Sequence, residues 1–281
     1  MIVVTGATGN VGRVLVEVLA GAGEEVVAVS RGGGAAGSAS GVRWVRGGVG
    51  EARSLRPALD GARAVFLVLG GELNFRGERP GALMEAVADA GAERIVLVSS
   101  QVSATRPEAA SHARLREFEA AVRASGREFT ILRPGGFASN ALAWAESVRA
   151  ERTVYAPFGE VALPVVDPAD IAAVAAAALR EDGHADRVYE LTGPEPIGPR
   201  RQAEVLSAAL GEEVRFVELS RAEAYAGMAR FMPEGVVAGT LDVLGAPLPA
   251  ERRVSPDVEA VLRRPAAPFA EWVARHLPAF A

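Results

Sequence analysis

Three glycines near the start of the chain have the spacing of a phosphate-binding turn. Gly6, Gly9 and Gly12 follow the apolar run MIVVT and precede a segment with helical character. A turn without side chains lets backbone N–H groups approach a diphosphate at the start of a helix, where the helix dipole also favours negative charge. Thr8 and Asn10 add small polar groups to this turn. The pattern predicts a dinucleotide site, with an ordinary strand–helix turn as the alternative.

The end of the second apolar run indicates which dinucleotide would bind. The run EVVAVS (25–30) is followed by Arg31, at a place where an acidic residue would bind the ribose hydroxyls of NAD. A guanidinium there suits the 2′-phosphate of NADPH. The alternative is a solvated surface arginine. We therefore expect NADPH as the cofactor and regard NADH as the less favoured one.

Three side chains further along are candidates for the proton chemistry of a reduction. Ser100 and Ser103 follow the fifth apolar run, RIVLVSS (94–100), and His112 lies in the helical segment beyond it. A hydroxyl can polarise a carbonyl, and an imidazole with a pKa near ~6.5 can donate a proton at neutral pH. We take these three residues as catalytic candidates. The alternatives are serines bonded to the backbone and a histidine that faces solvent.

Two absences exclude other chemistry. All 30 basic residues are arginine, and the chain has no cysteine. There is therefore no lysine for a Schiff base or a Tyr-x-x-x-Lys pair, and no thiolate for catalysis or metal binding. The three histidines have no metal-ligand spacing, so we expect no metal site.

Short apolar runs that alternate with helical segments would position these residues. The continuous apolar character of the runs is typical of strands covered on both faces, and strands joined by helices are parallel with right-handed crossovers. We therefore predict an α/β fold with a doubly wound parallel sheet, the Rossmann architecture. The predicted strands are 1–5, 25–30, 42–46, 64–70, 94–100 and 128–134. The predicted helices are 10–22, 52–59, 81–90 and 107–125.

The second half of the chain has more prolines and a different pattern. Asp167 or Asp170 is expected to cap a helix that contains the apolar run 171–179. Further strands are predicted at 187–193 and 213–219, and the rest is mostly helical. We expect a Rossmann core over residues 1–155 and a small substrate-side lobe over residues 156–281 that is interleaved with the core.

Composition limits the partners and the location. The 281 residues are 49% hydrophobic and 23% charged, with a net charge of −5 and a pI near 5.5, so we expect a globular protein without a nucleic-acid partner. The longest apolar run is far short of the ~20 residues of a membrane span, and no secretory signal is recognised. We expect a cytoplasmic monomer or homodimer without a membrane partner.

Several longer stretches resemble one family. TGATGNVG, VLVSS and ASGREFTILRPGGFASN, followed by DPADIAAVAAAAL, YELTGPEPI and PFAEWVARH, are similar to the NmrA-like group of atypical short-chain dehydrogenases/reductases over nearly the whole chain. The resemblance implies a Rossmann fold that binds NAD(P)H. The cofactor contacts that it implies are Gly6, Thr8, Gly9, Asn10, Val11, Arg31, Leu69, Gly70 and Ser99, with a nicotinamide wall that includes Pro134, Gly135 and Phe137.

The family implies a reductase, and the missing Tyr–Lys pair restricts which kind. Members include quinone and ketone reductases, among them tailoring enzymes of aromatic polyketides, and redox-sensing proteins that bind the cofactor without turnover. We expect NADPH-dependent hydride transfer to an aromatic carbonyl substrate, a quinone or polyketide-type ketone, with the substrate assisting. The alternatives are a non-catalytic NADP(H) sensor and a non-redox enzyme. Candidate walls of the substrate cleft are Phe137, Trp144, Tyr155, Phe158, Met228, Phe231 and Met232.

Overall fold

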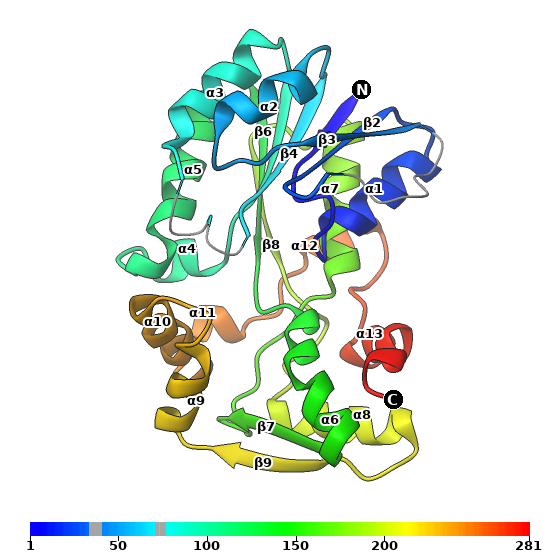
Figure 1. Cartoon of the computed structure of the whole chain (residues 1–281), viewed down its shortest axis with the longest axis vertical. Helices are drawn as coiled ribbons and strands as arrows, with labels where there is room; N and C mark the ends of the chain where they lie inside the picture. The colour runs from blue at the N-terminus through cyan, green and yellow to red at the C-terminus, as the bar shows by residue number, and fades with distance from the viewer. Residues whose placement is uncertain (34–40, 71–72, 74–76) are drawn as a thin grey trace.

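The computed structural model describes residues 1–33, 41–70, 73 and 77–281, and its main feature is a seven-stranded parallel sheet above a smaller lobe (Figure 1). The strand order is β3-β2-β1-β4-β5-β6-β8, and every neighbouring pair is parallel. This order confirms the predicted doubly wound α/β sheet. The strands in chain order are β1 (Ile2–Val4), β2 (Val26–Ser30), β3 (Val42–Arg46), β4 (Ala64–Val68), β5 (Arg94–Val98), β6 (Glu128–Pro134) and β8 (Arg187–Leu191).

Helices cover both faces of this sheet, which explains the continuous apolar runs. In β1, Ile2 and Val4 pack into the core on one face and Val3 into the core on the other, and all three are fully buried. One face is covered by α1 (Gly12–Gly21), α7 (Pro168–Arg180) and α12 (Asp257–Leu262). The other face is covered by α2 (Ala52–Leu59), α3 (Pro80–Asp89) and α5 (Ala113–Ala124) (Figure 1).

The strand order reverses at β1: β2 and β3 lie on one side of it, and β4, β5, β6 and β8 lie on the other. The connections that follow β1 and β4 therefore run to opposite sides, and a crevice opens at the ends of these two strands. Thr5, just beyond β1, is buried and lines this crevice. Its hydroxyl donates to the Phe66 carbonyl oxygen at 3.0 Å and accepts the Val68 N–H at 3.1 Å. One side chain thereby bonds the two strands at the point where they separate.

The start of α7 confirms one of the two predicted helix caps. The Asp167 carboxylate accepts the Ala169 N–H at 2.8 Å, and Pro168 occupies the first helical position. Asp170 in the first turn accepts from Arg264 at 2.6 Å and from the Ala267 N–H at 2.7 Å. The Asp170 carboxylate therefore also ties the C-terminal segment to α7.

The lobe below the carboxyl edge of the sheet contains a separate pair of parallel strands and its own apolar core. Trp272 is fully buried there, stacked on Phe269 and edge-on to Phe280. Its elements are η3 (Ala138–Trp144), α6 (Ala145–Glu151), β7 (Thr153–Pro157), α8 (Pro199–Leu210), β9 (Arg215–Leu219), α13 (Phe269–His276) and η4 (Leu277–Ala279). Three more helices lie beside them, under α4 (Val102–Thr105): α9 (Arg221–Met228), α10 (Glu234–Gly245) and α11 (Pro249–Arg252) (Figure 1).

Three details differ from the expected elements. Strand β7 was not predicted, because its central Tyr155 is exposed and the segment ends at Pro157. The strand predicted at 213–219 is β9, which pairs with β7 outside the main sheet. The helix predicted over 107–125 begins only at Ala113, after a short 3₁₀ turn, η2 (Ala110–His112). None of the helices in the described part of the chain is long and apolar enough to span a membrane.

Candidate functional site

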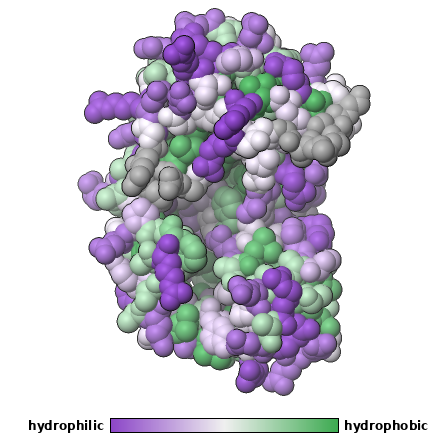
Figure 2. Space-filling view, in the orientation of Figure 1, coloured by the Kyte–Doolittle hydropathy of each residue, from purple (hydrophilic) through white to green (hydrophobic). Residues whose placement is uncertain are grey.

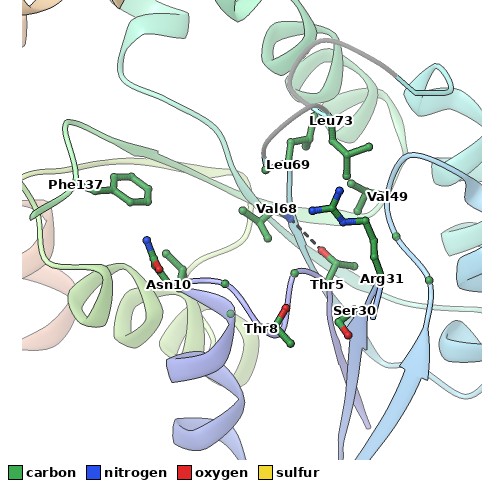
Figure 3. A pocket seen from close by; sticks show the side chains of 17 residues that line it. Thr5, Thr8, Asn10, Ser30, Arg31, Val49, Val68, Leu69, Leu73 and Phe137 are labelled. Atoms are coloured by element: carbon green, nitrogen blue, oxygen red, sulfur yellow. Dashed lines mark hydrogen bonds between the residues drawn. The ribbon is translucent and has the colours of Figure 1, made fainter. Parts of the chain in front are cut away.

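A cavity of about 280 Å³ opens at the carboxyl ends of β1, β2 and β4 (Figure 3). It lies in the crevice between the diverging strands, above the hollow that crosses the middle of the molecule in Figure 2. The structure gathers here the predicted cofactor residues Gly6, Thr8, Gly9, Asn10, Val11, Arg31, Leu69, Gly70 and Phe137. The other described lining residues are Thr5, Gly12, Ser30, Gly47, Gly48, Val49, Val68 and Leu73.

The glycine turn forms a cradle that larger side chains would fill. Gly6 has a positive φ of 61°, a conformation that L-residues with a side chain rarely adopt. A Cβ on Gly12 would lie 2.2 Å from the Gly6 carbonyl oxygen, so the helix start and the turn touch directly. Helix α1 begins here with no side-chain cap on its first turn. Bare backbone and an uncapped helix start fit the diphosphate of a dinucleotide.

Arg31 supplies positive charge to the same cavity. It directly follows β2, and its side chain points into the cavity (Figure 3). The neighbouring Ser30 hydroxyl donates to the Gly33 carbonyl oxygen at 2.6 Å and is therefore turned back into its own loop. None of the described lining residues is Asp, Glu, His, Tyr or Cys. The site thus presents a cation and backbone amides, the chemistry that binds phosphate groups.

Phe137 forms the other end of the cavity, and the glycine turn is bonded to the segment that carries it. The Phe137 ring points into the cavity (Figure 3). The Asn10 side-chain amide donates to the hydroxyl of Ser139, in η3, at 3.0 Å. The Ala138 N–H donates to the Val166 carbonyl oxygen at 2.9 Å, which fixes the start of η3 from the other side. The Asn10 side chain therefore joins the two ends of the site.

The remaining predicted cofactor residues, Ser99, Pro134 and Gly135, are not among the described residues that line the cavity. Pro134 accepts the Gln101 N–H at 2.9 Å through its carbonyl oxygen, and the Gly135 N–H donates to the Leu191 carbonyl oxygen at 2.9 Å. These bonds fix the end of β6 just before Phe137. Pro134 and Gly135 thus hold the backbone that leads to Phe137.

Ser99 and Ser103 belong to a buried polar network. The Ser99 hydroxyl donates to the Glu119 carboxylate at 2.6 Å and is 3.2 Å from the Ser103 hydroxyl. Arg133 donates to both oxygens of Glu119, at 3.0 and 2.5 Å. Burial raises the pKa of Glu119, but the hydrogen bonds from Arg133 and Ser99 outweigh it and hold the pKa below its usual range. Glu119 is therefore ionised and paired at neutral pH.

The other two catalytic candidates stand apart from the cavity lining. The Ser100 hydroxyl accepts the Val102 N–H at 3.2 Å and so shapes the turn after β5. The Nδ1 atom of His112, in η2, is 2.9 Å from the Ser111 hydroxyl. Burial and the charge of Arg116 lower the pKa of His112 against the opposing influence of Glu251. The imidazole is therefore neutral at pH 7 and poorly suited to act as a proton donor.

Sequence reasoning missed part of the cavity wall. Gly47 and Gly48 directly follow β3 at the same sheet edge, a signal that the paired glycines after VRWVR could have given. Of the residues expected to line the substrate cleft, Phe137 lines this cavity. Phe158 packs within the α9–α10 cluster, and the Tyr155 hydroxyl donates to Glu151 at 2.7 Å on the surface.

The crevice, the glycine cradle and the arginine define a dinucleotide-binding protein of the Rossmann class. Residues 6–182 match the family described as NAD(P)H-binding. The chain belongs to this NAD(P)H-binding family, and this confirms the resemblance to the NmrA-like atypical short-chain dehydrogenases/reductases.

Relatives of known activity extend over the whole chain. It is 40% identical to a (4-alkanoyl-5-oxo-2,5-dihydrofuran-3-yl)methyl phosphate reductase of Streptomyces griseus, over 100% of this chain and 99% of the relative. It is 34% identical to an NAD(P)H azoreductase of Xenophilus azovorans, with the same coverage. Among solved structures, an NADPH-dependent quinone oxidoreductase of Escherichia coli complexed with NADPH superposes with a TM-score of 0.79, at 27% identity over 99% of this chain and 100% of that chain.

Proposed function

We propose that this chain, an NAD(P)H-dependent oxidoreductase of its family, uses NADPH to reduce a quinone or a carbonyl conjugated to an unsaturated ring. The observation that carries the proposal is the content of the cavity. The described lining combines a glycine cradle and Arg31 with no side chain of the proton-donating kinds Asp, Glu, His, Tyr and Cys. The chain can thus bind the reductant, while the acceptor itself must stabilise the negative charge that hydride transfer creates on it.

Three parts of the lining divide the binding of the cofactor. The turn from Gly6 to Gly12 would hold the diphosphate, Arg31 the 2′-phosphate, and Phe137 one side of the nicotinamide. NADPH supplies the hydride when it is bound. The choice of NADPH over NADH rests on Arg31 and is supported by the quinone oxidoreductase at 27% identity, whose structure contains NADPH.

The acceptor class follows from the absence of an acidic side chain among the described residues that line the cavity. A quinone that receives a hydride becomes a hydroquinone anion, which is stabilised by its ring and takes a proton from water. An isolated aliphatic ketone becomes a strongly basic alkoxide, which needs a donor in the site. The relatives are named for reduction of an acylated oxo-dihydrofuran phosphate, of azo compounds and of quinones, which supports a delocalised acceptor.

A panel of matched acceptors tests the proposal. Purified protein is mixed with NADPH and either a naphthoquinone, an aromatic ketone with a neighbouring phenol, or cyclohexanone, and loss of the nicotinamide absorbance is followed. We expect steady turnover with the first two and none above background with cyclohexanone. Equal rates with cyclohexanone would contradict the acceptor class. Tight NADPH binding without turnover on any acceptor would favour an NADP(H)-sensing protein, which the missing Tyr–Lys pair would also suit.

A further inference from the structure

A partly buried ion pair joins the end of the sheet to the C-terminal lobe. Arg106, which follows α4, donates from Nε to Oε1 of Glu251 at 2.8 Å and from Nη2 to Oε2 at 2.9 Å. Glu251 lies in α11 and is only 2% exposed. The two residues are 145 positions apart in the chain, so this fork-shaped contact connects two distant segments.

Both partners make further bonds that fix their orientation. The Glu251 carboxylate also accepts from the Thr105 hydroxyl and from the Leu248 N–H, each at 2.8 Å. The Arg106 guanidinium also donates to the Ala246 carbonyl oxygen at 2.9 Å, at the C-terminal end of α10 where the helix dipole favours a cation. A single guanidinium therefore holds both α10 and α11, the α10–α11 segment (residues 234–252).

The contact is linked by hydrogen bonds to the Phe137 end of the cofactor cavity. Gln101 donates its side-chain amide to the Ala250 carbonyl oxygen at 3.2 Å and its backbone N–H to the Pro134 carbonyl oxygen at 2.9 Å. Pro134 ends β6 three residues before Phe137, which faces the cavity. In Figure 1 the α10–α11 segment lies directly below α4, beside the hollow that Figure 2 shows between the sheet and the lobe. The segment is thus bonded to the same backbone that positions the nicotinamide wall.

We propose that Arg106 is a positioning residue for the acceptor: it holds the α10–α11 segment against the end of β5 and so sets the width of the acceptor cleft. This inference rests on the proposed reductase function and adds to it the group that determines acceptor fit. A flat conjugated acceptor binds between two closely spaced walls. A cleft of fixed narrow width therefore favours flat acceptors over bulkier ones.

A purely stabilising role would not require this arrangement. Apolar contacts join lobes at least as well, because a buried ion pair loses much of its attraction to desolvation. What the fork of Arg106 and Glu251 adds is a defined distance and angle between the two segments. Removal of the fork should therefore alter the geometry of the cleft more than it alters the cofactor site, whose described lining contains neither residue.

The test compares Arg106→Met with Arg221→Met. Arg221 also binds α10, through Asp242 at 2.7 Å, but this pair is exposed and lies within the lobe. We expect Arg106→Met to raise the KM for a naphthoquinone at least ten-fold, with the Kd for NADPH within two-fold of wild type. Trypsin should cleave Arg106→Met faster than wild type at the arginines within residues 221–253, because the α10–α11 segment is held less firmly. Arg221→Met should leave KM and Kd unchanged.

Two further variants separate positioning from folding. Arg106→Lys keeps the charge but can bind only one carboxylate oxygen, so it should restore part of the affinity for the acceptor. If Arg106→Met does not fold, Glu251→Gln keeps the shape of the side chain and should raise KM by a smaller factor. An unchanged KM in a variant that trypsin shows to be loosened would overturn the inference. Failure of the wild-type protein to turn over any acceptor would instead count against the proposed function.

Discussion

The glycine cradle gives the sharpest test of cofactor binding, through the variant Gly12→Ala. An ideal Cβ on Gly12 lies 2.2 Å from the Gly6 carbonyl oxygen, whereas real Cβ contacts are essentially never under 3.0 Å, so the turn must move by about 3.0 − 2.2 = 0.8 Å. A displacement of this size misaligns the amides that would meet the diphosphate. Loss of one charge-assisted hydrogen bond costs about 1.5–3 kcal/mol, which is roughly a ten-fold to hundred-fold rise in the Kd for NADPH.

Gly21→Ala is the matched control, because Gly21 lies in the same helix with nothing within 4 Å of an added Cβ. Alanine has the better helix propensity by up to about 1 kcal/mol, so this variant should melt slightly higher and bind NADPH with unchanged affinity. Titration calorimetry gives the Kd, and thermal unfolding shows whether each variant is folded. If Gly12→Ala binds NADPH like wild type and gains the same stability as Gly21→Ala, the cradle is not the diphosphate site.

Four further outcomes follow from the described contacts. Arg31→Ala should reduce the preference for NADPH over NADH at least ten-fold in kcat/KM, and an unchanged ratio would refute the 2′-phosphate assignment. Ser139→Ala should weaken NADPH binding about three- to ten-fold through the lost bond from Asn10, yet leave binding of 2′-phospho-ADP-ribose, which lacks the nicotinamide, unaltered in calorimetry. His112→Ala should lower kcat less than ten-fold, so a fall of several thousand-fold would show that it donates a proton after all. The folded-state pKa of Glu119 lies below its unfolded value, so its contribution to the free energy of unfolding is complete above pH ~4.5 and is lost as the pH falls through the folded pKa. Denaturant titrations at decreasing pH should therefore show a smaller loss of unfolding free energy for Glu119→Gln than for wild type.

The fold was predictable because its signals are local. Strands β1, β2, β4 and β5 are nearly continuous apolar runs buried on both faces, and the strand–helix alternation fixes a parallel sheet. The glycine turn and Arg31 were predictable for the same reason, since both lie at strand ends that meet on one edge of the sheet. Strand β7 was not predicted because its central Tyr155 is exposed and Pro157 ends the segment, so no continuous apolar run marks it.

The predictions for Ser99 and Ser103 depended on contacts between distant segments, which the sequence does not display. Their position just after β5 suggested a cofactor wall and a catalytic hydroxyl. The structure turns the Ser99 hydroxyl toward Glu119, 20 residues later, and that carboxylate is also bonded by Arg133 from β6. The proposed role of Arg106 could not be predicted from the sequence for the same reason, because its partner Glu251 lies in the C-terminal lobe.

The charged side chains at the cofactor cavity and near the end of β5 have different roles. Glu119 and Glu251, the buried acids near the end of β5, each pair with an arginine and keep their pKa values low, so at neutral pH neither holds a proton to give. Arg31, in contrast, faces the cavity where a phosphate would lie. The charge of Arg31 thus serves cofactor binding, whereas the paired charges of Glu119 and Glu251 fix the geometry of the segments near the end of β5. If Arg106 sets the width of the acceptor cleft, as we propose, Arg106 variants should change the order of preference among quinones of different size while the preference for NADPH persists.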